Sequence, residues 1–330
     1  MRLPIGVFAA ALLAAAAAQA ASYHARRNVY GQPDLGGVWN SDYAMPLEGT
    51  PGVPLVLDEV QAKAFARGLA DAVHAYAAFK IDGEVQDLAE HDARMGAGVV
   101  KGERRSRQVV LPADGIIPMA PPARAQLRVI ERLILNSEDP PIPSDGPEQR
   151  RNWERCLVGQ GQPPILITND INPREILQTK DAVVILSEYG PDLRIIPLTD
   201  KHGPKTFDGP LGDPIARWDG EALVVETIRL PAADTIRPLP TLLVPPSAVV
   251  EERYTRVSET ELLYQYTVKD PAIYTAPWLA EYSLYRTRHP ILEFACHEGN
   301  YALPNILSGA RAIERAKFSR PRAAPAGSPR

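Results

Sequence analysis

The sequence predicts a mainly β fold, either an antiparallel barrel or a strongly curved sheet, with a helical and loop insertion and a C-terminal helix. Proline accounts for 33 of the 330 residues, which is about twice the usual ~5%. Because so much proline cannot sit inside long helices or central strands, it indicates many short elements joined by fixed loops. From about Asn152 onward, apolar residues recur with the period of two that is typical of strands. Turn residues separate these segments, as in a series of hairpins. A sandwich of two sheets is the alternative.

The first strand is predicted around Gly37-Val38-Trp39. A Gly-x-Trp at the start of a first strand is typical of lipocalin-like barrels, in which the Trp closes one end. The alternative is a core Trp beside a turn. Residues 50–150 are expected to form the insertion, with a helix over 57–80 capped by Asp58, a short strand over 108–111 and a second helix over 122–136.

The rest of the chain is predicted to be a meander of antiparallel hairpins. Asp219-Gly220 is the strongest of its turn signals. A helix over 304–318 and a disordered tail over 319–330 complete the chain, and 21–318 is expected to be a single domain. The strands are expected over 182–186, 193–198, 215–218, 222–228, 249–256, 262–269, 282–287 and 291–297.

Residues 1–20 are predicted to be a cleaved secretory signal peptide. Arg2 precedes an apolar run over 7–17, and Ala18-Gln19-Ala20 offers the small residues of a cleavage site. The run is shorter than the ~20 residues that span a bilayer. We therefore expect a periplasmic or secreted protein with no membrane span.

Export makes a disulfide between Cys156 and Cys296 the expected state of the two cysteines. Two separate buried thiols are the alternative. The net charge of −4 gives no indication of a nucleic-acid surface. The six histidines show no metal-ligand spacing, so we expect neither a metal nor a cofactor, and a zinc site could arise only by spatial convergence.

The first candidate cluster lies at the end of the last predicted strand. There His297 and Glu298 follow Cys296 directly, and a histidine held beside a carboxylate is suited to proton transfer near neutral pH. The alternative is that both residues only fix the corner between this strand and the final helix through hydrogen bonds.

The second candidate cluster comprises Glu188, Arg194 and His202, with Asn169 upstream. If Leu193 faces one side of its strand, Arg194 faces the other, which in a barrel could be the interior. An interior Arg194 would need Glu188 or an anionic ligand to offset its desolvation. An exterior salt bridge is the alternative.

Two aromatic residues complete the predicted ligand contacts. Tyr266 shares one strand face with Leu262, Tyr264 and Val268. Trp278 follows in a proline-rich loop, where it either covers the mouth of a cavity or simply packs.

Several blocks of the sequence resemble a large family of exported, mostly uncharacterised bacterial proteins. The blocks include PDLGGVWN, ERCLVGQGQPP, DPIARWDGEALVVETIRL and EFACHEGNYALPNILSGAR, and the similarity extends over most of the mature chain. The resemblance implies export and the pairing of Cys156 with Cys296, and it implies no catalytic residues. The chain differs from the common pattern at residues 168–172 and at Asp219, where Glu is frequent.

The leading functional hypothesis is a cofactor-free extracytoplasmic enzyme, a lyase, hydratase, isomerase or hydrolase, acting on a small apolar or aromatic molecule. His297 would be the general acid or base, Glu298 or Glu188 its partner, and Arg194 the anchor for an anion or developing oxyanion. The first competing hypothesis is a periplasmic binding or carrier protein without turnover, with His202, Asn169, Trp278 and Tyr266 as ligand contacts. The second is a structural envelope protein with a filled core.

Overall fold

A computed structural model describes residues 23–41, 45–80, 96–135, 144–167, 172–190, 192–204, 209–238 and 241–319. The predicted signal peptide, Asn169 and residues 320–330 of the predicted tail lie outside these ranges. None of the helices in the described part of the chain is both long enough and apolar enough to cross a membrane.

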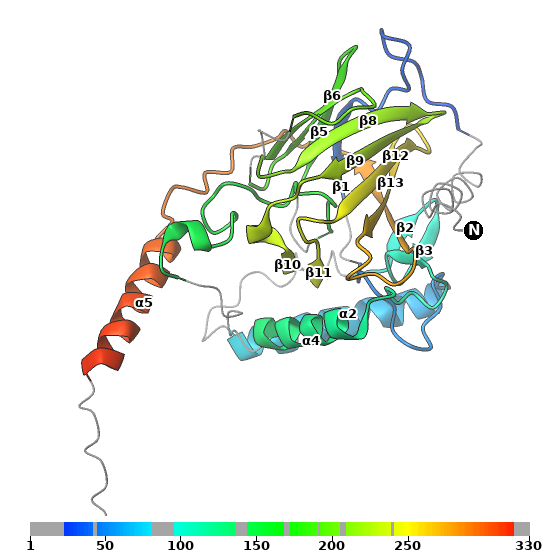
Figure 1. Ribbon diagram of the computed structural model, residues 1–330. Helices are drawn as coiled ribbons and strands as arrows, with labels where there is room; N and C mark the ends of the chain where they lie inside the picture. Colours follow the sequence, from blue (N-terminus) through cyan, green and yellow to red (C-terminus); the bar gives the residue numbers. More distant parts are fainter. Residues whose placement is uncertain are drawn as a thin grey trace, which may run out of the picture.

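One antiparallel sheet of ten strands dominates the molecule (Figure 1). The strand order is β7-β6-β5-β1-β14-β13-β12-β9-β8, and β4 also pairs with β14. A bridge between Leu198 and Ala216 brings the two ends of this order together, with Thr199 N–H donating to the Ala216 carbonyl at 3.0 Å. The expected fold is therefore confirmed as a nearly closed antiparallel barrel. Its strands are β1 (Gly37–Asn40), β4 (Val109–Leu111), β5 (Arg174–Gln178), β6 (Ala182–Ser187), β7 (Asp192–Pro197), β8 (Asp213–Asp219), β9 (Ala222–Ile228), β12 (Val249–Arg256), β13 (Glu261–Lys269) and β14 (Leu279–Arg286).

The Gly-x-Trp segment forms β1 and places Trp39 in the core. The indole is fully buried, and its Nε1–H donates to the Leu35 carbonyl at 2.9 Å. The guanidinium groups of Arg256 and Arg286 lie 5.7 and 5.4 Å from its ring. Gly37 has a φ of +133°, and a Cβ there would come 2.5 Å from the Arg286 guanidinium. Only glycine combines this backbone conformation with so close an approach.

The insertion contains α2 (Glu59–Lys80), α4 (Pro121–Leu135) and a hairpin of β2 (Gly98–Val100) and β3 (Glu103–Arg105). Asp58 caps α2 as predicted, because its Oδ1 accepts the Gln61 N–H at 2.8 Å while Gln61 Oε1 accepts the Asp58 N–H at 3.0 Å. Both helices lie below the barrel in the view of Figure 1. Leu127 and Ile130 of α4 are buried in a small cluster with Leu243.

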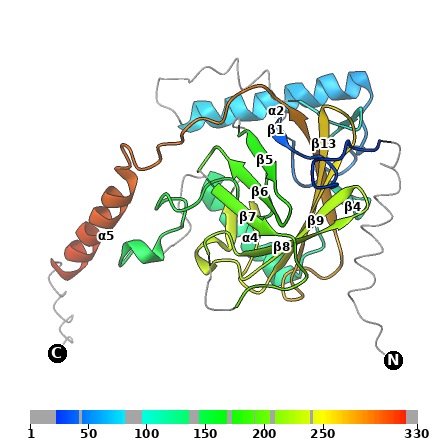
Figure 2. The ribbon, with the colours of Figure 1, turned by 90° about the horizontal axis from the view of Figure 1, so that it is seen from above.

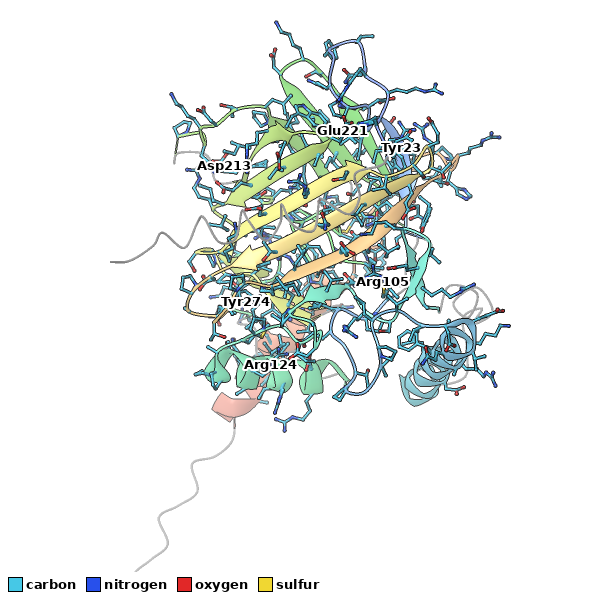
Figure 3. The ribbon with its side chains drawn as sticks, turned by 90° about the vertical axis from the view of Figure 1, so that its right-hand side faces the viewer. Tyr23, Arg105, Arg124, Asp213, Glu221 and Tyr274 are labelled. Atoms are coloured by element: carbon cyan, nitrogen blue, oxygen red, sulfur yellow. A yellow bond between two sulfur atoms is a disulfide. The ribbon has the colours of Figure 1, made fainter. Side chains whose placement is uncertain are left out.

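The insertion also covers the outer face of β13 and β14 through polar contacts. Arg105 lies 3.6 Å from Glu281, which in turn accepts a hydrogen bond from Gln265 at 2.9 Å (Figure 3 labels Arg105). The backbone N–H of Lys101 donates to Glu261 at 2.7 Å. These contacts explain why all but the last residue of β13 is buried, although it faces both the interior and the outside.

The strand predicted over 291–297 is wrong. Residues 291–295 have no regular structure and 296–299 form a turn. The physical reason is that β14 has no free edge for a further hairpin partner, because β13 pairs on one side and β1 and β4 pair on the other. The segment passes instead over the β6–β7 turn, where the Leu292 N–H donates to Glu188 at 2.6 Å. It leads into α5 (Ala302–Ser319), which lies to one side of the barrel (Figures 1 and 2).

Several elements were not predicted from the sequence. The most important is β5, which joins β1 to β6 and so makes the sheet continuous. The others are short: the β2–β3 hairpin, β10 (Ile236–Pro238), β11 (Thr241–Leu243) and the two 3₁₀ turns η1 (Pro147–Gln149) and η2 (Ala232–Asp234).

Candidate functional site in the barrel interior

Strand β7 places two charged side chains on its inner face beside the buried Ile196. Arg194 and Asp192 point inward and are only 2% and 3% exposed, whereas Leu193 and Ile195 point outward and are 52% and 59% exposed. A strand on the surface of a globular protein ordinarily places its apolar residues inside. The two inward-facing charges therefore mark a polar part of an otherwise apolar interior.

The charge partner of Arg194 is Glu252 on β12. The guanidinium donates from Nη1 to Oε1 at 3.0 Å and from Nη2 to Oε2 at 2.5 Å, so the pair is bidentate. Nη2 also lies 3.4 Å from the Thr227 hydroxyl of β9. The two charged side chains are 1% and 0% exposed. Three strands that are distant in the sequence thus meet at one ion pair in the interior.

Two tyrosines complete this network. The hydroxyls of Tyr254 and Tyr264 donate to Glu252 Oε1 at 3.0 and 2.8 Å. The register of β12 and β13 places the two tyrosines opposite each other, with ring centroids 4.9 Å apart. Tyr282 on β14 lies opposite Tyr264 with its ring centroid 4.9 Å away. The Arg194–Glu252 pair is therefore bordered by Tyr254, Tyr264 and Tyr282, which we call the tyrosine wall.

The electrostatics keep Arg194 charged and keep the hydroxyls of Tyr254 and Tyr264 protonated. Burial by itself would lower the pKa of Arg194, but the adjacent Glu252 carboxylate raises that pKa overall. Burial, followed by the charge of Glu252, raises the pKa values of Tyr254 and Tyr264 well above the ordinary value. The guanidinium remains charged and the hydroxyls remain donors. The Arg194 Nε–H has no hydrogen-bond partner among the described residues.

A segment of the chain itself, Gly159–Ile167, borders this interior. At Ile165 the N–H donates to the Tyr264 hydroxyl at 2.8 Å, and the carbonyl accepts from Tyr282 at 2.9 Å. Ile165 is only 1% exposed. The segment therefore occupies the space in front of the tyrosine wall.

The start of this segment is held by Asp192. Its carboxylate accepts the N–H groups of Gly159 at 2.9 Å and Gly161 at 2.7 Å. Burial raises the Asp192 pKa to about 6, although these hydrogen bonds act in the opposite direction. A Cβ on Gly159 would come 2.1 Å from the Tyr189 carbonyl, so the two chain segments touch backbone to backbone.

In the described part of the chain, the interior around Arg194 and Glu252 is tightly packed, since the two side chains are 1% and 0% exposed. A void of about 10 Å³ lies beside Tyr282, Ser283 and Ile167. A larger pocket of about 520 Å³ lies near Trp39, where Gly37, Val38, Thr260 and Arg286–Arg288 line it. Neither pocket is lined by Arg194.

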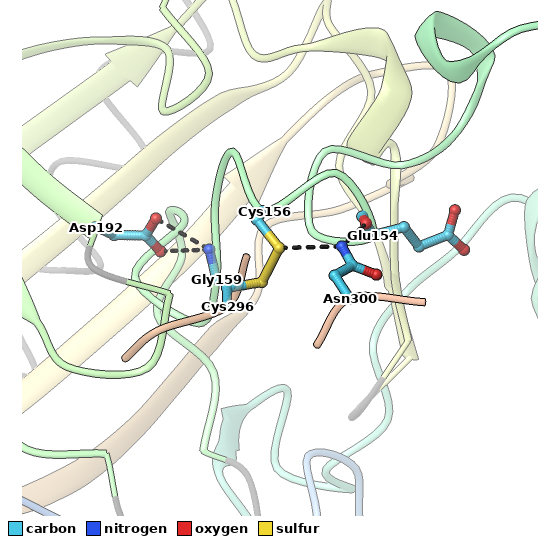
Figure 4. Close-up of a disulfide and its surroundings, with 6 residues drawn as sticks. All are labelled: Glu154, Cys156, Gly159, Asp192, Cys296 and Asn300. Carbon is cyan, nitrogen blue, oxygen red and sulfur yellow. Dashed lines mark hydrogen bonds between the residues drawn. A yellow bond between two sulfur atoms is a disulfide. The ribbon is translucent and has the colours of Figure 1, made fainter. Parts of the chain in front are cut away.

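The predicted disulfide is present. Cys156 and Cys296 are joined with a Cα–Cα distance of 5.7 Å, and no free cysteine occurs in the described chain (Figure 4). The Asn300 amide donates to the Glu154 carbonyl at 3.1 Å beside it. The bridge fixes the segment after β14 to the residues that lead into Gly159–Ile167.

The catalytic residues predicted from the sequence do not lie together in the structure. Arg194 is inside the barrel, whereas His297 and Glu298 lie exposed on a turn. Glu188 accepts the Leu292 N–H outside the barrel. His202 is held between two carboxylates, with Nδ1 3.0 Å from Asp213 and Nε2 3.1 Å from Glu226. No described contact connects His202 or His297 with Arg194.

The predicted aromatic contacts are buried. Tyr266 and Trp278 are 0% and 2% exposed, with ring centroids 6.0 Å apart. The Tyr266 hydroxyl donates to Gln108 Oε1 at 2.9 Å and the Trp278 Nε1–H donates to the Val268 carbonyl at 3.1 Å. Both polar groups are satisfied within the protein.

Sequence reasoning missed Glu252, Tyr254 and Thr227. A signal for Glu252 was present, because it lies between Val250 and Tyr254 at the two-residue spacing that places all three on one strand face. A carboxylate on the inner face of a long strand is the natural partner of an inward-facing arginine.

No family model matches the chain, and no curated protein matches it. The solved structures that it resembles align with 42% of this chain. One is a mutant of the fluorescent protein UnaG, of which 90% of the chain aligns (16% identity, TM-score 0.24). Another is a SAHS protein from Ramazzottius varieornatus, of which 87% of the chain aligns (12% identity, TM-score 0.25). A third is the REP1-NXSQ fatty acid transporter, of which 86% of the chain aligns (13% identity, TM-score 0.22). TM-scores of this size carry no argument about function.

Proposed function

We propose that this protein is an extracytoplasmic binding protein that holds a small, neutral, largely apolar or aromatic molecule inside the barrel without converting it. The observation that carries the proposal is the fully buried Arg194–Glu252 pair beside three tyrosines, in which the Arg194 Nε–H has no partner among the described residues. A buried ion pair is on average no more stabilising than apolar side chains of similar volume. A barrel that only had to be filled would gain nothing from it.

The charges of the network indicate the class of ligand. Arg194 and Glu252 balance each other, so an anionic ligand would be repelled by a carboxylate that is already in place. A carbonyl or hydroxyl oxygen of the ligand can instead accept a hydrogen bond from the Arg194 Nε–H. The rings of Tyr254, Tyr264 and Tyr282 are suited to stacking against an aromatic or apolar body.

Access to this site requires a movement of Gly159–Ile167. The segment is held at Ile165 by two tyrosine hydroxyls and at its start by Asp192. Withdrawal would expose these hydroxyls and leave the space of Ile165 to the ligand. The disulfide at Cys156 keeps the segment attached during such a movement. It also supports folding outside the cytoplasm.

The described contacts give the enzyme hypothesis no comparable support. His297 and Glu298 are exposed on a turn and are not joined to the interior network. We therefore favour binding without turnover.

The test uses two neutral fluorescent probes, PRODAN, which carries a carbonyl group, and N-phenyl-1-naphthylamine, which does not. The mature protein should bind PRODAN saturably, one molecule per chain, with blue-shifted emission. The double variant Arg194→Met/Glu252→Gln removes the charged pair but keeps an oxygen for the two tyrosine hydroxyls. It should bind PRODAN at least tenfold more weakly, because one charge-assisted hydrogen bond contributes about 1.5–3 kcal/mol. Its binding of N-phenyl-1-naphthylamine should change little.

The matched control is Arg217→Met/Glu293→Gln, which makes the same substitutions at two exposed positions that line neither pocket. It should bind both probes like the unaltered protein. Absence of saturable PRODAN binding after prolonged incubation would refute the binding proposal and leave a structural barrel with a filled interior. Equal PRODAN affinity of the interior variant and the unaltered protein would remove Arg194 from the site.

A further inference from the structure

The outer surface of β5, β6 and β7 carries a contiguous apolar face. Leu177, Leu193 and Ile195 are 51%, 52% and 59% exposed, and Val184 and Leu186 are half-buried. The register connects all three strands, because Val184 pairs with both Leu177 and Ile195, and Leu186 pairs with Leu193. We call these five residues the outer apolar face. Contiguous exposed apolar surfaces of this kind commonly mark protein interaction sites.

The second incompletely covered element is α5. Leu303, Ile306 and Leu307 follow one stripe at helical spacing, yet no described side chain of α5 is buried. Ile313, further along the helix, is 60% exposed. Figures 1 and 2 show that the helix lies beside the barrel and does not cover β5–β7. Among the described residues, the apolar stripe of α5 is therefore only partly covered, and no helix covers the outer apolar face of β5–β7.

The charges of the two surfaces are complementary. The sequence from Ala302 to the C-terminus contains six basic residues and one acidic residue, Glu314, which gives a net charge of +5. Because the whole chain has −4, the remainder has −9. Near the outer apolar face, Glu175 lies on the outer side of β5, and Lys180, Asp181 and Glu188 follow β5 and β6, so this surface has an excess of negative charge. The basic residues of the C-terminal segment are Arg311, Arg315, Lys317, Arg320, Arg322 and Arg330.

We propose that α5 of one copy lies across the outer apolar face of a second copy, in a reciprocal pairing of two chains. The dimensions agree, since an 18-residue helix is roughly 27 Å long and six-residue strands are roughly 20 Å long. The helix is directed away from its own barrel. The disulfide fixes its base, and Arg311 donates to the Ser144 carbonyl at 3.0 Å. A second copy is therefore the natural partner, and a two-fold axis makes both contacts equivalent.

The first experiment measures the molar mass of the mature protein against concentration by sedimentation equilibrium. A monomer–dimer equilibrium is expected. The face variant Leu193→Gln/Ile195→Gln and the arm variant Ile306→Gln/Ile313→Gln should each weaken dimerisation at least tenfold. Neither pair of substitutions changes the charge of the protein.

The matched control is Ser308→Gln/Ala312→Gln on the opposite, exposed side of α5, which should dimerise like the unaltered chain. Near-UV circular dichroism should be the same for all variants, because none of the substituted side chains is part of the barrel core.

The deciding experiment mixes the face variant with the arm variant. Each homodimer has lost both helix–face contacts, whereas the mixed dimer retains one, formed by the intact arm of the first chain on the intact face of the second. An equimolar mixture should therefore associate more strongly than either variant alone. A protein that stays monomeric up to its solubility limit would overturn the proposal. So would a mixture that associates no better than its components.

Discussion

The substitution Arg194→Met tests the energetics of the barrel interior most directly. It leaves the Glu252 carboxylate with two hydroxyl donors, from Tyr254 and Tyr264, but without its counter-charge. Glu252 is 0% exposed, so water cannot replace the guanidinium without opening the barrel. Removing one partner of a buried pair costs about 3–5 kcal/mol. For a domain whose stability is about 5–15 kcal/mol, that is a large fraction of the total.

A double-mutant cycle separates the loss of the pair from the loss of the arginine side chain. Glu252→Gln in the Arg194→Met background removes the uncompensated charge and still offers an oxygen to both tyrosines. The double variant should therefore recover at least about 2 kcal/mol relative to Arg194→Met alone. Urea unfolding monitored by far-UV circular dichroism and by Trp fluorescence measures all four corners of the cycle. The control Arg217→Met/Glu293→Gln, at two exposed positions, should change stability by less than about 0.5 kcal/mol. A cost below about 1 kcal/mol for Arg194→Met would show that Glu252 is hydrated and that the interior is open.

Two further predictions concern the segment that borders the interior. Because burial raises the pKa of Asp192 from its ordinary 3.8 to about 6, the folded protein keeps this proton to a higher pH than the unfolded chain. The residue therefore destabilises the fold increasingly as the pH rises from 3.8 through 6. Asp192→Asn should gain up to about 3 kcal/mol relative to the unaltered protein between roughly pH 4 and pH 7, and a pH-independent difference in urea unfolding would contradict this. Gly159→Ala places a Cβ 2.1 Å from the Tyr189 carbonyl and should cost about 1–3 kcal/mol or more. Gly68→Ala in α2 has open space around it and should gain about 0.5–1 kcal/mol, so equal melting temperatures of the two variants would show that the tight backbone contact is absent.

Much of the barrel could be predicted because its signals are local. Alternating apolar residues and the Asp219-Gly220 turn define β8 and β9, and the same alternation places Tyr264 and Tyr266 on one face of β13. Asp58 identifies the start of α2 because a cap and its reciprocal partner are three residues apart. Such features depend on the periods of strands and helices and require no knowledge of the neighbouring elements.

The segment over 291–297 shows the limit of this reasoning. Its alternation favours a strand, but a strand also needs a free edge to pair with, and β14 has none. Whether an edge is free depends on strand order, and the order here depends on β5, which the sequence analysis did not identify. The orientation predicted for His297 depended on this strand. Because the strand is absent, that prediction does not apply.

The sequence alone determined that this chain alternates like a β protein, that its two cysteines could pair, and that Arg194 faces the opposite side of its strand from Leu193. Only the tertiary structure decided that this side is the interior and that Glu252, 58 residues away, is the partner. The reason is physical. The direction of a side chain follows from the two-residue period of its own strand, whereas its partner across a barrel is fixed by closure, which brings β7, β9 and β12 together only when all the strands between them are in register.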